Sequence, residues 1–301
     1  MSMAGLKHYL SKRGSWFFML SSRGLLNWMP DETYLKLLFK YSMGYPLDLE
    51  HPKTYNEKLQ WLKLHDRKPL YTQLVDKLAV KDYVAEKLGP EYVVPVIGGP
   101  WDSVDEIDFD ALPDQFVLKC THDSGGVVVC RGKAQFDREA AKAKLAKSLS
   151  RNFYWANREW PYKDVRPRVF AERYLENKLG ELPDYKFLTF GGETRLMYIA
   201  TGRNSDSGTR CDYYDADFVH LPFENGHENA DIPPEKPLCF EQMKELAAIL
   251  GRDFCQMRVD FFEADDRVYF GELTFFHWSG LAPFHPPEWD ETLGSWIKLP
   301  M

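Results

Sequence analysis

Two stretches near the C-terminus, 256–262 and 268–275, are rich in aromatic and β-branched residues and predict the strands of a hairpin. Side chains alternate between the two faces of a strand. Arg258 and Asp260 therefore share a charged face, and Glu272 belongs to the same face of the second strand. An arginine beside two acids is a set that can hold phosphate groups and a cation.

The pairing of the two strands depends on the turn between them. If Asp265-Asp266-Arg267 is a three-residue turn, Asp260 lies opposite Glu272 and Val259 lies opposite Leu273. Two facing carboxylates repel each other unless a cation lies between them. A hard divalent cation with oxygen ligands, such as Mg²⁺ holding phosphate oxygens, would resolve the conflict. A solvated face on which the neighbouring arginine neutralises both acids explains the pattern equally well.

A second candidate site combines lysines with glycines. Lys119 ends a predicted strand, and Ser124-Gly125-Gly126 forms the tip of the predicted hairpin that follows. Glycines allow backbone N–H groups to close over phosphates, and a lysine adds a point charge. The alternatives are a simple tight turn and, for Lys77, an ordinary exposed helix lysine. A P-loop is excluded because no GxxxxGK[ST] motif precedes a helix.

The middle of the chain offers residues that could contact a nucleotide base and sugar. The segment Glu172-Arg173-Tyr174-Leu175 ends an apolar strand, and its backbone could face a purine edge, although a core strand would look the same. Asp184 and Lys186 share a face of the next strand, and Arg203 follows in a polar loop. A surface group of salt bridges is the alternative for these charges.

Periodicity predicts the elements that position these residues. Helices are expected from Asp31, after a Thr54–Glu57 capping box, and over 74–88, 138–149 and 240–250. Further strands are expected over 92–97, 115–120, 127–130, 168–175, 185–190 and 194–201, and 224–237 reads as a surface loop. Because βαβ alternation is missing, the pattern predicts an α+β protein with mixed or antiparallel sheets.

The overall composition limits the classes of molecule that the protein is expected to bind. The chain has 301 residues, 44% of them hydrophobic, which suits two or three lobes. Its net charge of −7, with scattered Lys and Arg, predicts no nucleic-acid partner. Five cysteines without a CxxC pair indicate a reduced, cytoplasmic protein. The apolar stretch 15–20 is too short to span a membrane and predicts a docked helix, with contact at a membrane face left open.

Taken in order, these motifs resemble the ATP-grasp superfamily. Lys77 lies on a helix like the one before the ATP-grasp domain of D-alanine:D-alanine ligase-like enzymes. The resemblance implies that Lys77, Lys119 and the 124–126 loop contact the phosphates of the nucleotide. It implies that residues 172–175 hold the adenine and that Asp184 contacts the ribose. It also makes Arg258, helped by Arg203 or Lys186, the catalytic group. The implied magnesium ligands are Asp260, Glu272 and Thr274, where Thr274 departs from the usual asparagine.

Four phrases extend the resemblance to the TupA-like ATP-grasp family across nearly the whole chain. They are Thr54-Tyr55-Asn56-Glu57-Lys58-Leu59-Gln60-Trp61, Arg158-Glu159-Trp160-Pro161-Tyr162, Asp184-Tyr185-Lys186-Phe187 and Gly271-Glu272-Leu273-Thr274-Phe275. The expected organisation is a helical extension (1–65), a pre-ATP-grasp segment (66–112), a lobe with the glycine-rich lid (113–172) and a C-terminal lobe with the magnesium-binding hairpin (173–301).

The resemblance implies a function linked to bacterial surface polysaccharides. The expected activity is an ATP- and Mg²⁺-dependent ligase that joins a carboxylate-bearing glycan or sugar, such as a uronic acid, to an amine or amino acid through an acyl phosphate. The alternatives are a sugar or small-molecule kinase on the same fold, and a non-catalytic glycan-binding scaffold. Peripheral contact with membrane-bound polysaccharide machinery stays open.

Overall fold

The computed structural model describes residues 14–176, 182–202 and 208–300, and its strands form two main antiparallel sheets. The four-stranded sheet has the order β1-β4-β2-β3 and consists of β1 (Val96–Trp101), β2 (Phe116–Cys120), β3 (Val127–Cys130) and β4 (Val169–Arg173). The five-stranded sheet has the order β10-β9-β5-β6-β7 and consists of β5 (Asp184–Phe190), β6 (Glu193–Thr201), β7 (Arg210–Asp215), β9 (Met257–Ala264) and β10 (Arg267–Thr274). The α+β prediction is confirmed.

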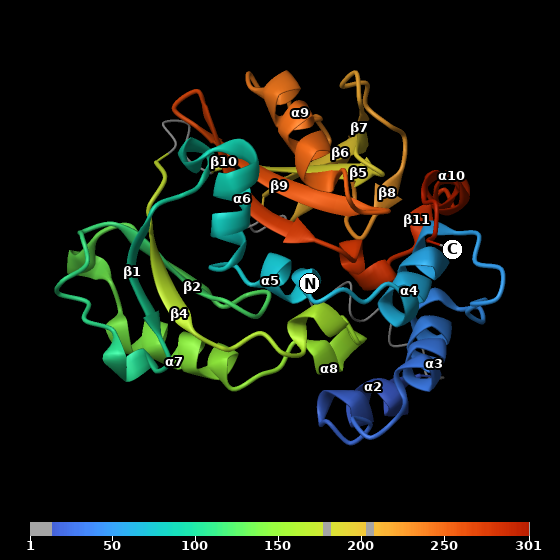
Figure 1. Cartoon of the computed structure of the whole chain (residues 1–301), viewed down its shortest axis with the longest axis horizontal. Helices are drawn as coiled ribbons and strands as arrows, with labels where there is room; N and C mark the ends of the chain where they lie inside the picture. The colour runs from blue at the N-terminus through green and yellow to red at the C-terminus, as the bar shows by residue number, and fades with distance from the viewer. Residues whose placement is uncertain (1–13, 177–181, 203–207, 301) are drawn as a thin grey trace.

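Helices cover these sheets and extend the molecule beyond them (Figure 1). They are α2 (Ser15–Ser22), α3 (Asp31–Met43), α4 (Tyr55–His65), α5 (Leu70–Val75), α6 (Val80–Leu88), α7 (Arg138–Leu149), α8 (Tyr154–Asn157), α9 (Phe240–Gly251) and α10 (Glu288–Trp296). The predicted capping box is confirmed, since Glu57 N donates to Thr54 Oγ1 and Thr54 N donates to the Glu57 carboxylate.

Three predicted elements need correction. The helix expected over 74–88 is two helices, because Asp76 Oδ1 accepts bonds from the N–H groups of Leu78 and Ala79 and so breaks the helical ladder. The strand expected over 92–97 begins only at Val96 and continues to Trp101. The expected loop 224–237 contains a short strand, β8 (Glu224–Asn225), paired with β11 (Phe284–His285).

The C-terminal hairpin has the predicted pairing but a different tip. Asp260 lies opposite Glu272 and Val259 opposite Leu273, as expected. The turn contains only Asp265 and Asp266, both with positive φ, because Ala264 pairs with Arg267. A bulge at Gly271 then shifts the register by one residue and restores the predicted pairs.

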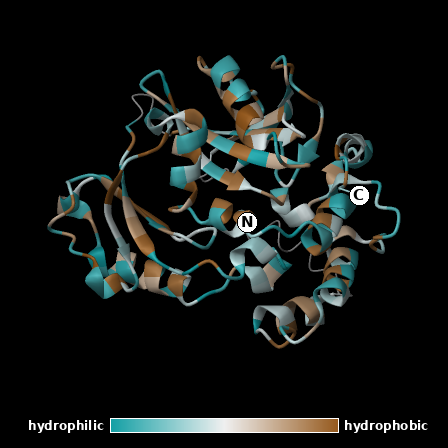
Figure 2. Cartoon of the chain, in the orientation of Figure 1, coloured by the Kyte–Doolittle hydropathy of each residue, from teal (hydrophilic) through white to brown (hydrophobic). Residues whose placement is uncertain are grey.

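The main core lies between the five-stranded sheet and α9. Phe187 and Val259 on the sheet are buried with Phe240, Met243 and Ala247 of α9. Hydrophobic residues follow the strands, while hydrophilic residues occupy the outer surfaces (Figure 2). Since side chains alternate along a strand, Asp184 and Lys186 of β5, Arg258 and Asp260 of β9 and Glu272 of β10 lie on the opposite face, away from α9.

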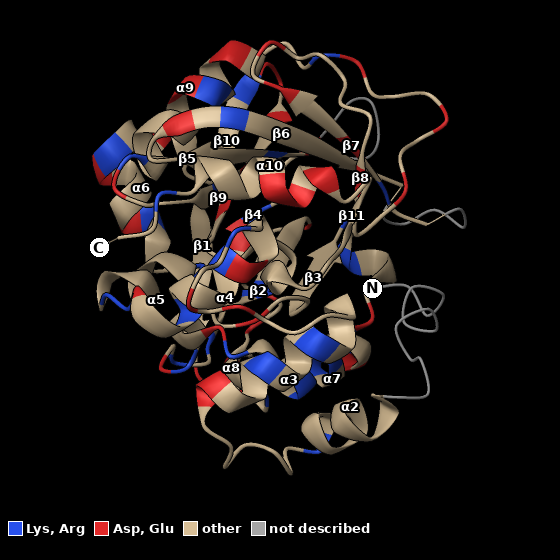
Figure 3. Ribbon diagram, turned by 90° about the vertical axis from the view of Figure 1, so that its right-hand side faces the viewer, with Lys and Arg blue, Asp and Glu red and all other residues tan. Residues whose placement is uncertain are grey.

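The N-terminal helices form a separate cluster beside the sheets. Phe17 of α2 is fully buried and packs against Tyr34 and Tyr41 of α3, which confirms that the apolar stretch is a docked helix. In the part of the chain that the structure describes, no helix combines the length and the apolar character needed to cross a membrane. Charged residues of both signs are interspersed on the outer helices (Figure 3).

Candidate functional site

Arg258 joins the two facing acids of the C-terminal hairpin. Its Nε donates to Asp260 Oδ1 at 2.7 Å, and its Nη2 donates to Asp260 Oδ2 at 2.8 Å and to Glu272 Oε1 at 2.7 Å. Asp260 is only 1% exposed. The arginine therefore neutralises both acids, as one of the two interpretations required; Asp260 is buried, whereas the Glu272 side chain is 36% exposed.

Lys186 extends this charged face onto β5. Because Lys186 lies opposite Asp260 in the sheet, its Nζ donates to Asp260, and it also lies 2.8 Å from Asp184 Oδ2. Burial raises the pKa of Glu272, but the positive charges of Lys77, Arg258 and Lys186 have the larger effect and lower it to about 2. Glu272 is therefore an anion at neutral pH.

The donor set around Glu272 fits magnesium only in part. Thr274 Oγ1 lies 3.3 Å from Glu272 Oε1, so the hydroxyl shares the predicted position. Over residues 14–176, 182–202 and 208–300, no three His, Cys, Asp or Glu side chains gather as a metal site would require. Mg²⁺ commonly uses one or two protein carboxylates with phosphate oxygens and water. The residues present therefore fit a magnesium ion that arrives with phosphates.

In the four-stranded sheet, a buried glutamate of β4 pairs with two lysines, one on β2 and one on α6. Glu172 is 4% exposed, and its two oxygens lie 2.5 Å from Lys81 Nζ and 2.5 Å from Lys119 Nζ. Burial raises the pKa of Glu172, but Lys119 and Lys81 outweigh that effect and lower it. Lys81 is a further residue of this site that the sequence pattern did not indicate; it lies on α6, whereas Lys77 precedes that helix.

Lys77 connects the lid loop to the charged face of the other sheet. Its Nζ donates to the carbonyl of Asp123 at 2.6 Å and lies 3.9 Å from Glu272 Oε2. In the loop between β2 and β3, Ser124 and Gly125 are exposed, and Gly125 has φ +111°, which favours glycine. The structure thus brings Lys77, the predicted lid and the predicted metal ligands together.

The remaining predicted residues are placed elsewhere. Arg173, Tyr174 and Leu175 line a cavity of about 900 Å³ with Tyr269 of β10. Lys77, Lys119, Asp260 and Glu272 do not line that cavity. Arg203 lies outside the described residues.

A turn that follows β10 has an unusual backbone. Trp278, Ser279 and Gly280 have φ values of 48°, 58° and 62°, and the first two are strained because non-glycine residues rarely adopt this region. Gln60 Nε2 donates to the carbonyls of Ser279 and Gly280 at 3.0 and 2.8 Å. Lys63 Nζ donates to the Ser279 carbonyl at 2.8 Å. Helix α4 therefore holds the turn in its strained shape.

Comparison with known proteins identifies one family. The family described as TupA-like ATPgrasp matches residues 57–298. A search of curated proteins finds no significant match to the chain.

Several solved structures show distant similarity. A D-alanine–D-alanine ligase from Helicobacter pylori is 16% identical, with a TM-score of 0.41 over 81% of this chain and 69% of that one. The Bacillus anthracis D-alanine–D-alanine ligase, solved with ATP, is 16% identical, with a TM-score of 0.40 over 78% of this chain and 61% of that one. The N5-carboxyaminoimidazole synthetase from Staphylococcus aureus is 16% identical, with a TM-score of 0.36, and here the match covers 67% of this chain but only 44% of that one.

Proposed function

We infer, from the premise that this chain belongs to the TupA-like ATPgrasp family, that it is an ATP-dependent ligase joining a carboxylate to an amine. The observation that carries this proposal is the meeting of Lys77 with Glu272 at 3.9 Å, between the lid loop and the Arg258–Asp260 pair. This arrangement brings cations and carboxylates together at one place, which is what a nucleoside triphosphate with its metal ion needs.

The proposed roles follow from position. Lys77 and Lys119 neutralise phosphate oxygens, and Ser124-Gly125-Gly126 closes over them. Asp260, Glu272 and Thr274 would hold Mg²⁺, which when bound neutralises charge on the phosphate oxygens. Residues 172–175 and Asp184 are proposed for the adenine and the ribose. Because both oxygens of Glu172 already hold lysines, its part in adenine binding would come from its backbone.

The proposed reaction has two steps. A carboxylate oxygen attacks the γ-phosphorus of ATP, the bond to the β-phosphate oxygen breaks, and ADP leaves. An amine then attacks the acyl phosphate, inorganic phosphate leaves, and the amine releases a proton. Arg258 and Lys186, and by resemblance Arg203, would stabilise the charge that develops on the transferred group. The lid would exclude water, which would otherwise hydrolyse the intermediate.

We propose a uronic acid of a surface polysaccharide or its precursor as the carboxylate, and an amino acid or small amine as its partner. The family to which the chain belongs and a cavity beside the lid loop support this choice of substrate. Release of phosphate that depends on both a carboxylate and an amine is the expected outcome. A phosphorylated sugar formed without any need for an amine would favour a kinase instead.

The decisive experiment is calorimetric titration of ATP, with and without Mg²⁺. Wild type should bind ATP in a magnesium-dependent manner, and the Asp260→Asn/Glu272→Gln double variant should bind at least about tenfold more weakly, a loss of ~1.4 kcal/mol. The matched control is Asp231→Asn/Glu235→Gln, which removes two exposed acids from the 224–237 segment. Thermal melts would establish that both variants are folded. Absence of ATP binding by wild type would refute the proposed function.

A further inference from the structure

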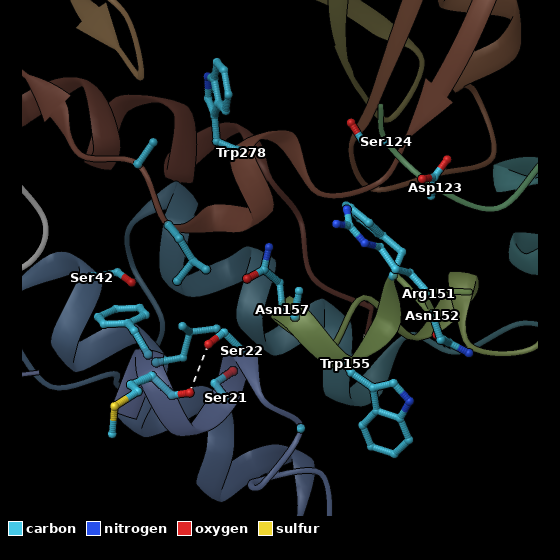
Figure 4. Close-up of a pocket in the computed structure, with 18 of the residues that line it drawn as sticks. Ser21, Ser22, Ser42, Asp123, Ser124, Arg151, Asn152, Trp155, Asn157 and Trp278 are labelled. Carbon is cyan, nitrogen blue, oxygen red and sulfur yellow. Dashed lines mark hydrogen bonds between the residues drawn. The ribbon is translucent and has the colours of Figure 1, made fainter. Parts of the chain in front are cut away.

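A large cavity lies beside the lid loop, on the side of the N-terminal helices (Figure 4). Its volume is about 980 Å³, at the upper end of the ~300–1,000 Å³ range of small-molecule sites. Its walls come from α2, α3, the segment 151–157, the lid loop and the segment 278–282. These segments are far apart in the sequence, so only the folded chain creates the cavity.

We propose that this cavity binds the carboxylate substrate of the ligase, that the substrate is a ring compound rich in hydroxyl groups, and that Arg151 anchors its acidic end. The proposal rests on the proposed function, because it assigns the second substrate of the same reaction.

The lining has the chemistry of a saccharide site. Serine hydroxyls and the Asn157 amide supply hydrogen-bond donors and acceptors, and Phe18 and Trp278 supply apolar faces. Asn157 lies near the centre, between Ser22 of α2 and Ser124 of the lid loop (Figure 4). A mixture of amides, hydroxyls and aromatic rings suits a substrate that presents both hydroxyl groups and ring C–H surface.

Arg151 supplies positive charge to this lining. Its guanidinium extends into the open centre of the cavity (Figure 4). In the described part of the chain, no carboxylate forms an ion pair with it. A guanidinium can bind a carboxylate through two parallel hydrogen bonds. Arg151 is therefore available to bind an acidic substrate.

The cavity also adjoins the proposed phosphate site. Asp123 and Ser124 line it, and the Asp123 carbonyl accepts the hydrogen bond from Lys77 Nζ at 2.6 Å. Lys77 in turn lies 3.9 Å from Glu272. A substrate in the cavity would lie beside the loop that is proposed to close over the phosphates.

The strained turn at Trp278 supports a binding role. Strain of this kind persists where the surrounding structure holds it in place, and it is concentrated at functional sites. Here Gln60 and Lys63, both fully buried, hold the carbonyls of the turn. The result is that Trp278 is fixed on the cavity wall, with Gly226 packed against its indole.

Part of the wall lies outside the family match. Phe18 and Ser22 on α2 precede residue 57, where the match begins. The family-wide region therefore supplies Arg151, Asn157 and Trp278, while the N-terminal helices complete the cavity. We expect the N-terminal wall to determine which saccharide fits.

The first test uses calorimetry with two probes, tetragalacturonate and the neutral maltotetraose. Wild type should bind the acidic chain more tightly than the neutral one, and Arg151→Gln should weaken tetragalacturonate binding at least about tenfold. Arg131→Gln, which changes an exposed arginine outside the cavity, should leave the binding unchanged. Equal affinity of Arg151→Gln and wild type, or no preference for the acidic chain, would overturn the proposal.

A second variant tests whether the α2 side of the cavity contacts the saccharide, by filling space and without changing charge. Ser22→Phe places a ring in the cavity from α2 and should also weaken tetragalacturonate binding at least about tenfold; unchanged binding would remove α2 from the site. Mg-ATP binding measured on the same samples separates the two hypotheses. If wild type binds Mg-ATP but not tetragalacturonate, the cavity proposal alone fails; if it does not bind Mg-ATP, the ligase proposal fails as well.

Discussion

At the scale of single residues, the state of His277 follows from its neighbours. Asn225 Nδ2 donates to the carbonyls of Ala282 and Pro283 at 2.9 and 3.2 Å, so its Oδ1 must face His277 Nε2, 3.1 Å away. His277 Nε2 therefore carries the proton and donates. The other ring nitrogen, Nδ1, is then an acceptor, and it faces Arg258 Nη1 at 3.5 Å.

This environment makes a prediction about pH. Burial, and then the charges of Arg258 and Lys186, lower the pKa of His277 well below its usual 6.5. Below pH 6.5 the unfolded chain gains a proton that the folded chain does not accept, so this histidine costs stability as the pH falls. Between pH 7.5 and 5.5 its contribution to the free energy of unfolding should fall by about 1.4 kcal/mol.

Urea denaturation at the two pH values measures this loss. His277→Gln should show a smaller decrease than wild type, because the variant has no imidazole at this position. His51→Gln, at an exposed site, is the matched control and should keep the wild-type decrease. An identical decrease in His277→Gln would mean that His277 is already protonated in the folded protein.

At the scale of elements, the C-terminal hairpin shows what alternation can and cannot predict. The strand pattern predicts that Asp260 faces Glu272, and it predicts this correctly because strand faces depend on local periodicity. It misses the two-residue turn and the Gly271 bulge, whose effects on the register cancel. The neighbouring position of β5, which brings Lys186 to Asp260, is a long-range pairing without a local signal.

Helix α4 shows a second limit of the sequence. Asn56, Gln60 and Lys63 occupy positions i, i+4 and i+7, a spacing that places them on one side of a helix. Polar residues in such a row would normally indicate a solvated face, yet all three are buried and bind the segment 279–282. The cavity was equally beyond prediction, because its walls come from separate parts of the chain.

The bulge at Gly271 gives a prediction for the hairpin. A Cβ at Gly271 would lie 3.0 Å from the Asp260 carbonyl oxygen and 3.2 Å from the Phe262 ring, so the β9 backbone at Asp260 must shift. Gly271→Ala should therefore weaken Mg-ATP binding at least about tenfold in calorimetry. In Gly132→Ala the nearest atom is 3.8 Å away, and binding should be unchanged. If both variants bind alike, the position of Asp260 does not limit nucleotide binding.

At the scale of the whole molecule, a buried arginine is one of the links between the N-terminal helices and the rest of the protein. Arg158 is fully buried, and its Nη2 donates to the carbonyls of Leu26 and Met29 at 3.0 and 3.4 Å. Its guanidinium also lies 4.3 Å from the Tyr34 ring, a favourable cation–π distance. Since α2 and α3 form one wall of the cavity, Arg158 links the shape of that cavity to the stability of the N-terminal cluster.

Replacing this arginine should release the N-terminal cluster while the sheets stay folded. In Arg158→Met the Met29 carbonyl loses its donor, which costs roughly 1–3 kcal/mol for an unsatisfied group, whereas the Leu26 carbonyl keeps the Met29 N–H as a donor. Limited proteolysis followed by mass spectrometry should then show faster cleavage within residues 14–54 than in wild type. Tetragalacturonate binding should fall while Mg-ATP binding persists, since the nucleotide residues lie on the two sheets and on the segment before α6. If both ligands are lost together, the N-terminal helices support the nucleotide site as well, and the two binding functions belong to one cooperative unit.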